Sequence, residues 1–230
     1  MLFHLAEPAE LLAIVVAFIL GVFVHDAAQV FAARLVRDPT PLRSGRLTTG
    51  VKNRLSPFSG LAVFIVGYGW AESVPMNDVW RKRRFHITAA VLAGPLSYLL
   101  LALGSLALFQ VVGEPGALFV GDRVVDTTLA DSFVARFTLW LAVTFGSMFI
   151  VSLIPVPPTD AGRLVFLLGP TTPSWRNAHY RLTEGNIGLV ILLALLLLPV
   201  MFAGFPSVVG QLVVPLLRGL ASLIGLTLPA

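Results

Sequence analysis

Three polar side chains interrupt an otherwise apolar stretch near the start of the chain: His25, Asp26 and Gln29. On a helix, residues four apart share a face, so His25 and Gln29 point the same way. The zinc-binding motif H-E-x-x-H uses this spacing, with two histidines on the metal and a glutamate that activates its water. Here aspartate and glutamine replace the glutamate and the second histidine. From the spacing alone, we expect buried polar groups that satisfy one another or face a cytoplasmic crevice.

The composition indicates that much of the chain lies in a lipid bilayer. Of 230 residues, 57% are hydrophobic and 12% are charged, more apolar surface than a soluble domain of this length could bury. The chain has no cysteine, which excludes disulfides, thiolate catalysis and thiolate-bound zinc. The net charge of +4 is small, and the basic residues adjoin apolar segments. This pattern favours lipid headgroups as partners and gives no reason to expect nucleic acid.

We therefore expect an all-α polytopic membrane protein with a single integral membrane domain, residues 1–230. The start of the chain lacks the basic region of a signal peptide, so its first apolar stretch is predicted to be a retained helix. Pro215 predicts a kink in the last apolar stretch. About five stretches are long enough to span a bilayer: 8–31, 86–112, 132–154, 186–202 and 206–226.

The apolar stretch 57–70 is too short for a span and contains Gly60, Gly67 and Gly69. Irregular backbone is tolerated at membrane depth only where protein or water covers it. We therefore predict a short re-entrant element here, with a small β-hairpin between residues 46 and 68.

Charge predicts the orientation in the membrane. Basic residues gather at 34–54, 81–84 and 163–181, whereas 113–131 holds four acidic residues and one basic residue. The positive-inside rule assigns the three basic stretches to the cytoplasm. The N-terminus is then expected outside and the C-terminus inside.

The polar cluster is the first of several short motifs along the chain. They are H-D-A-A-Q at 25–29 with R-D-P-T at 37–40, G-R-L-T at 45–48 with S-P-F-S-G at 56–60, G-W-A-E-S-V-P-M-N at 69–77 with A-G-P-L-S at 93–97, and S-L-I-P-V-P-P-T-D-A-G-R at 152–163. Together they resemble the site-2 protease family of intramembrane zinc metalloproteases, in particular its small prokaryotic members without a PDZ domain. The family-like core is 8–168, followed by a C-terminal helix pair at 186–226.

The resemblance implies roles for particular residues. The family's zinc ligands fall on His25, Gln29 and Asp160, and its catalytic glutamate falls on Asp26, one methylene shorter. Because a displacement of about 1 Å can cost on the order of 100-fold in rate, this base is expected to work poorly. The family's asparagine before the proline-rich run falls on Ser152.

The residues that differ from the family pattern are mainly those at the metal-ligand and base positions, whereas the glycines and prolines of the turns are the same. We therefore predict a catalytically inactive pseudoprotease without a metal cofactor, a scaffold or regulatory subunit in a prokaryotic plasma membrane. Its groove for a membrane-protein partner is expected to involve Gly60, Gly67 and Gly69, which favour strand addition by a partner peptide. Arg54 and Ser152 complete the expected groove, since Arg54 stands where the family has a histidine near its active site.

Two alternatives are open. The first is an active, non-standard zinc metalloprotease that cleaves a membrane protein with Asp26 as base. The second is a transport or channel subunit built around the polar cluster, which the lack of internal repeats and of further charges within the membrane disfavours.

Overall fold

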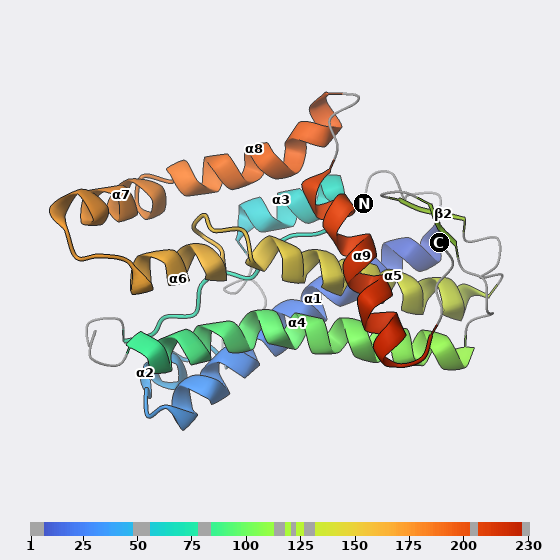
Figure 1. Cartoon of the computed structure of the whole chain (residues 1–230), viewed down its shortest axis with the longest axis horizontal. Helices are drawn as coiled ribbons and strands as arrows, with labels where there is room; N and C mark the ends of the chain where they lie inside the picture. Colours follow the sequence, from blue (N-terminus) through green and yellow to red (C-terminus); the bar gives the residue numbers. More distant parts are fainter. Residues whose placement is uncertain are drawn as a thin grey trace.

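The computed structural model describes residues 7–47, 56–77, 84–112, 118–120, 123–126, 132–202 and 207–226. In this part of the chain the protein is helical, apart from one short antiparallel strand pair (Figure 1). The elements are α1 (Pro8–Leu35), α2 (Thr40–Arg43), α3 (Pro57–Val66), α4 (Arg84–Val112), β1 (Leu118–Val120), β2 (Arg123–Asp126), α5 (Phe133–Ser152), α6 (Asp160–Leu168), α7 (Pro173–Thr183), α8 (Ile187–Met201) and α9 (Val208–Leu223).

Three long helices, α1, α4 and α5, pack against one another and form the centre of the molecule (Figure 1). The helices approach closely at Gly21 of α1, where an added Cβ would lie 3.2 Å from atoms of Met148 on α5 and Tyr98 on α4. At 1.5 Å per residue, the 28 residues of α1 extend about 42 Å, which exceeds the hydrocarbon thickness of a bilayer. This bundle positions the polar cluster, since His25, Asp26 and Gln29 lie on the second half of α1.

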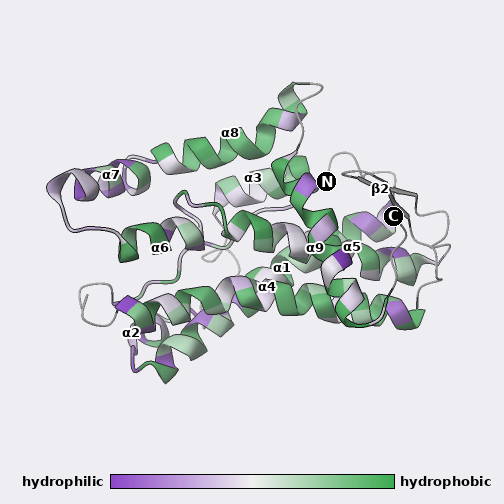
Figure 2. Ribbon diagram, in the orientation of Figure 1, coloured by the Kyte–Doolittle hydropathy of each residue, from purple (hydrophilic) through white to green (hydrophobic). Residues whose placement is uncertain are grey.

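Hydrophobic residues predominate along most of the helices, as the extent of green in Figure 2 shows. Large hydrophobic side chains such as Leu100 of α4 and Val190 of α8 are exposed. A soluble protein rarely shows such contiguous apolar surface. The helices that carry it are therefore placed in a lipid bilayer.

Three helices, α1, α4 and α5, are long and apolar enough to cross a membrane. The helices α7 and α8 are long and apolar enough only when they are taken together. They would then form a fourth span that is broken by a bend of 57°. The helix α9 is apolar but has only 16 residues. Within the part of the chain that the structure describes, three to four spans are supported, and the expected count of about five is not confirmed.

The stretch that was predicted to be re-entrant begins with the helix α3 and continues as an extended segment to Asn77. Pro57 occupies the first turn of α3, where a proline costs no hydrogen bond, and Gly67 ends the helix with φ of 91°. No strand occurs at 46–47 or 56–68, so the expected β-hairpin is not seen in the described part of that range. Gly60 does not end the helix, because a single glycine inside a helical stretch is tolerated at a cost of about 1 kcal/mol.

Candidate functional site

The polar cluster brings together two elements far apart in the sequence. His25, Asp26 and Gln29 project from α1, and Asp160 is the first residue of α6. The hydroxyl of Thr159 caps α6 by accepting from the backbone N–H of Gly162 over 3.1 Å, which fixes the start of the helix. All four polar side chains of the cluster are buried. Buried polar groups must find partners within the protein, and these partners determine what the site can do.

Asp160 is the centre of the cluster. His25 Nε2 donates to Asp160 Oδ2 over 2.8 Å, and Gln29 Nε2 donates to Asp160 Oδ1 over 2.7 Å. Because an ionised carboxylate can only accept hydrogen bonds, Nε2 of His25 carries a proton in this arrangement. The structure thus brings together the three residues that stand at the predicted ligand positions, joined by hydrogen bonds to one another.

The amide of Gln29 has a defined orientation. Its nitrogen also donates to the backbone carbonyl of Val91 on α4 over 2.9 Å, so two acceptors share its two hydrogens. Rotating the amide by 180° would set Oε1 against the carbonyl of Val91 and the carboxylate of Asp160, and oxygen would then face oxygen. As arranged, the buried Oε1 has no hydrogen-bond partner among the described residues. Gln29 therefore presents its N–H groups to the cluster.

Asp26 lies on the other side of the His25 ring. Its Oδ1 is 3.4 Å from His25 Nδ1, and its Oδ2 accepts from Arg46 Nε over 2.8 Å. Arg46 is itself buried, and its Nη2 donates to the carbonyl of Glu72 over 2.9 Å. The carboxylate at the family's base position is thus held in a buried ion pair. Sequence reasoning assigned no role to Arg46, although it belongs to the G-R-L-T stretch that supported the resemblance.

Two residues of α4 shape the cavity that holds the His25 ring. The ring of Tyr98 stacks on that of His25, with centroids 5.1 Å apart and an interplanar angle of 22°. A Cβ at Gly94 would lie 2.3 Å from His25 Nε2 and 2.5 Å from Gln29 Nε2. Only a glycine at this position lets α4 approach the polar face of α1 so closely. Both residues lie in or beside the A-G-P-L-S stretch, and their contact with His25 could not be read from the sequence.

These donors do not fit a zinc site as they are arranged. Zinc in proteins takes lone pairs from nitrogen, sulfur or oxygen, usually from three or four side chains. The near nitrogen of His25 bears a proton and Gln29 turns its N–H groups toward Asp160, so among the atoms that face one another only the carboxylate of Asp160 is an acceptor. The described residues contain no group of three or more His, Cys, Asp or Glu that could hold a metal. The polar groups instead hydrogen-bond to one another, with Oε1 of Gln29 left without a partner among the described residues.

An open cleft of about 670 Å³ adjoins the cluster at Thr159. Its walls come from the start of α3, the extended segment 70–76, the proline turn at 157–158 and the junction of α7 with α8. Side chains hold the extended segment in place. Ser59 bonds both backbone groups of Trp70, and Arg163 donates to the carbonyl of Val74.

The residues that were predicted to form a partner groove lie elsewhere than this cleft. Gly67 ends α3, and Gly69 packs against Ser59, where a Cβ would be 2.5 Å from Oγ. Gly60 has open space beside it, and the hydroxyl of Ser152 donates to the carbonyl of Phe149 over 2.6 Å. None of these four lines the cleft. Arg54 lies outside the described residues, and the sequence-based groove stays a prediction.

The apolar helices indicate a membrane protein, and similarity to a known protein supports a metalloprotease-like one. The chain is 27% identical over 188 residues to a protein of Bacillus subtilis (strain 168) named "Putative zinc metalloprotease YwhC". The match covers 81% of this chain and 80% of the relative. The chain matches no family model and no solved structure.

Proposed function

We propose that the protein is a catalytically inactive member of the site-2 protease family that binds a membrane partner without cleaving it. The observation that carries this proposal is the hydrogen bonding of Asp160 by both His25 and Gln29, at 2.8 and 2.7 Å. In a zinc protease these positions would direct lone pairs at a metal. Here the nitrogen atoms of His25 and Gln29 that face Asp160 are used as hydrogen-bond donors, and the unpartnered oxygen of Gln29 is on the other end of its amide.

The position of Asp26 supports the same conclusion independently of the metal. A general base must reach the water that it activates, within hydrogen-bond distance. Asp26 faces Nδ1 of His25, whereas Asp160 faces Nε2, so the two carboxylates lie on opposite sides of the ring. Its second oxygen is held by Arg46. An aspartate in this ion pair orients His25 and is a poor base for hydrolysis.

The cleft supports binding of an extended peptide. In an extended segment the backbone groups of successive residues point to opposite edges. The carbonyls of Glu72 and Val74, two residues apart, accept from Arg46 and Arg163 and so face the body of the protein. Ser73 faces the other edge, and among the described residues no hydrogen bond involves its backbone N–H or C=O. This edge suits strand addition by a partner segment.

Metal analysis of the purified protein tests the inactive reading. We expect zinc far below one atom per chain after purification without chelator and with zinc in the growth medium. One tightly held zinc per chain would contradict it.

Crosslinking tests the cleft. Because the chain has no cysteine, single cysteines can be introduced without background. Ser73→Cys, in the cleft, is expected to crosslink in native membranes to a partner segment adjoining a transmembrane helix, identified by mass spectrometry. Ser174→Cys is the matched control, because Ser174 is also exposed but does not line the cleft. Equal crosslinking of the two variants would contradict a specific groove.

The similarity to a protein named as a zinc metalloprotease favours a second candidate, a protease that acts on a membrane protein. In that case cleavage of a membrane substrate would disappear in both His25→Ala and Asp160→Ala. Cleavage that survives in both variants would exclude it.

A further inference from the structure

A second cavity, of about 300 Å³, lies at the end of α1, away from the His25 cluster. It is open to the surface and is bordered by the turn that follows α1, the residue that ends the extended segment, and the first turn of α4. Its lining consists of Val36, Arg37, Asp38, Pro39, Asn77, His86 and Ile87. The cavity shares no residue with the polar cluster or with the cleft beside it. Neither the inactive nor the active reading of the protein uses it.

Two side chains that can carry positive charge line this cavity, Arg37 and His86. Both are exposed, and neither side chain forms a hydrogen bond or ion pair with any residue that the structure describes. The backbone at Arg37 has φ of 64°, a left-handed conformation that residues other than glycine seldom adopt. An arginine at a position that favours glycine or asparagine suggests a use for its side chain.

The cavity also contains one acid, Asp38, whose oxygens are already engaged. Oδ1 accepts from the backbone N–H of Thr40 and Oδ2 from that of Asn77, each over 2.9 Å. The carboxylate therefore joins the turn after α1 to the end of the extended segment. Its role is to hold the cavity walls together, while the guanidinium of Arg37 stays available to an anion.

The helix α4 contributes further positive potential. His86 and Ile87 belong to its first turn, and the first backbone N–H groups of a helix have no partner within it. The dipole of a 29-residue helix places partial positive charge at this end. The cavity thus combines a guanidinium, an imidazole and a helix N-terminus, a set that matches a phosphate group.

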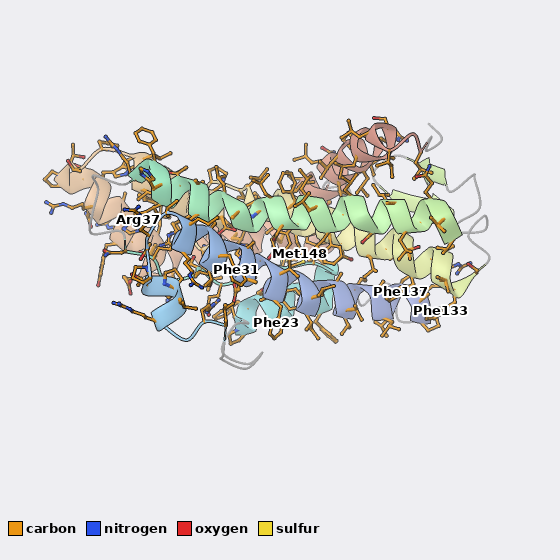
Figure 3. All side chains as sticks on the ribbon, turned by 90° about the horizontal axis from the view of Figure 1, so that it is seen from below. Phe23, Phe31, Arg37, Phe133, Phe137 and Met148 are labelled. Atoms are coloured by element: carbon orange, nitrogen blue, oxygen red, sulfur yellow. The ribbon has the colours of Figure 1, made fainter. Side chains whose placement is uncertain are left out.

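Its surroundings indicate a lipid as the source of that phosphate. Leu35 of α1 and Phe85 of α4 are 84% and 75% exposed, and Phe31 is also exposed one turn earlier on α1. Figure 3 shows Phe31 and Arg37 in the same end region of α1. Apolar side chains exposed beside cationic ones are typical of the depth at which acyl chains give way to headgroups.

We propose that this cavity binds the phosphate of an anionic membrane phospholipid, with Arg37 and His86 as its direct contacts. Basic pockets between membrane helices recognise lipid headgroups in this way. The lipid would bridge the end of α1 and the start of α4, the two helices that carry the polar cluster and Gly94.

The test uses the full chain in detergent, titrated with phosphatidylglycerol, phosphatidylcholine or inorganic phosphate, with binding followed by native mass spectrometry. We expect selective binding of phosphatidylglycerol. Arg37→Gln should weaken it about five- to tenfold, given the usual contribution of one arginine near an anionic surface. His86→Gln should weaken it in the same direction, and Arg37→Lys should restore part of the affinity.

Arg43→Gln is the matched control, because Arg43 is an exposed arginine nearby on α2 that does not line the cavity. It should leave phosphatidylglycerol binding within twofold of the parent protein. Equal losses in Arg37→Gln and Arg43→Gln would overturn the proposal in favour of general surface charge. Competition by inorganic phosphate at equal concentration would identify a free-phosphate site and overturn the lipid assignment. Unchanged binding in both Arg37→Gln and His86→Gln would refute the cavity as a site.

Discussion

The amide nitrogen of Gln29 donates to Oδ1 of Asp160 over 2.7 Å, although the two residues are 131 positions apart. His25 donates to the other oxygen of the same carboxylate. In the H-E-x-x-H pattern a metal ion would join these three positions; here hydrogen bonds join them directly. Under the proposed function, Gln29 both removes one metal ligand and supplies a hydrogen bond that joins α1 to α6 where a metal would have done so.

A single substitution should reverse this replacement. Gln29→His would put a second imidazole on the same face of α1 and remove the N–H donors that face Asp160. Three ligands of ordinary type for zinc would then converge, and we expect about one zinc per chain by elemental analysis. Proteolysis should not return with it, since Asp26 stays paired with Arg46.

The control for this gain of metal is the double variant Gln29→His with His25→Ala, which restores only two ligands. It should bind zinc much more weakly than Gln29→His alone. If both variants retain equal zinc, the metal is bound elsewhere and the assignment of His25 as a potential ligand is wrong.

Removing the central carboxylate should be costly. Asp160→Ala leaves the Nε2–H of His25 and one N–H of Gln29 without an acceptor in a buried site. Breaking a buried charged contact in this way typically costs about 3–5 kcal/mol in the free energy of unfolding. Reversible unfolding in mixed micelles would measure it. Glu184→Ala is the matched control, because Glu184 is exposed, and its expected change is within about 0.5 kcal/mol.

The residues of the cluster could be predicted from the sequence, but the hydrogen bonds and ion pairs between them could not. The spacing of His25 and Gln29 follows from helix geometry, and the resemblance added Asp160; all three lie together in the structure. The ion pair of Asp26 with Arg46 was missed, because a side-chain partner on a connecting segment depends on how that segment folds back. The expected hairpin is not confirmed in the described part of its range: Gly60 suggests a helix breaker, yet a single glycine inside an apolar helix is tolerated.

The pH dependence of stability should report on Asp38. Burial opposes its ionisation, but hydrogen bonds from Thr40 and Asn77, together with the positive charge of Arg163, hold its pKa below the ordinary value. A group with a lowered pKa in the folded state contributes stability above its unfolded pKa, about 3.9, and loses that contribution as pH falls through the folded pKa. Asp38→Asn should therefore be less stable than the parent by about 1 kcal/mol at pH 7.

The difference between the two proteins should shrink as the pH is lowered from 5 to about 3. Unfolding midpoints measured across this range, for parent and variant in the same detergent, would show it. A constant difference at every pH would mean that the charge of Asp38 plays no part and that only its shape matters.

The close approach of α4 to the cluster can be tested by its effect on stability, since a second glycine of α4 serves as a control. A methyl group at Gly94 would lie 2.3 Å from His25 Nε2 and 2.5 Å from Gln29 Nε2, so Gly94→Ala must displace the bonds to Asp160. Overpacking of this kind costs about 1–3 kcal/mol. Gly104 lies two and a half turns further along α4, with nothing within 4 Å of an added Cβ. There the same change should be neutral or stabilise the protein by up to about 1 kcal/mol through helix propensity. Equal effects of Gly94→Ala and Gly104→Ala on the unfolding midpoint would show that α4 does not press on the polar cluster.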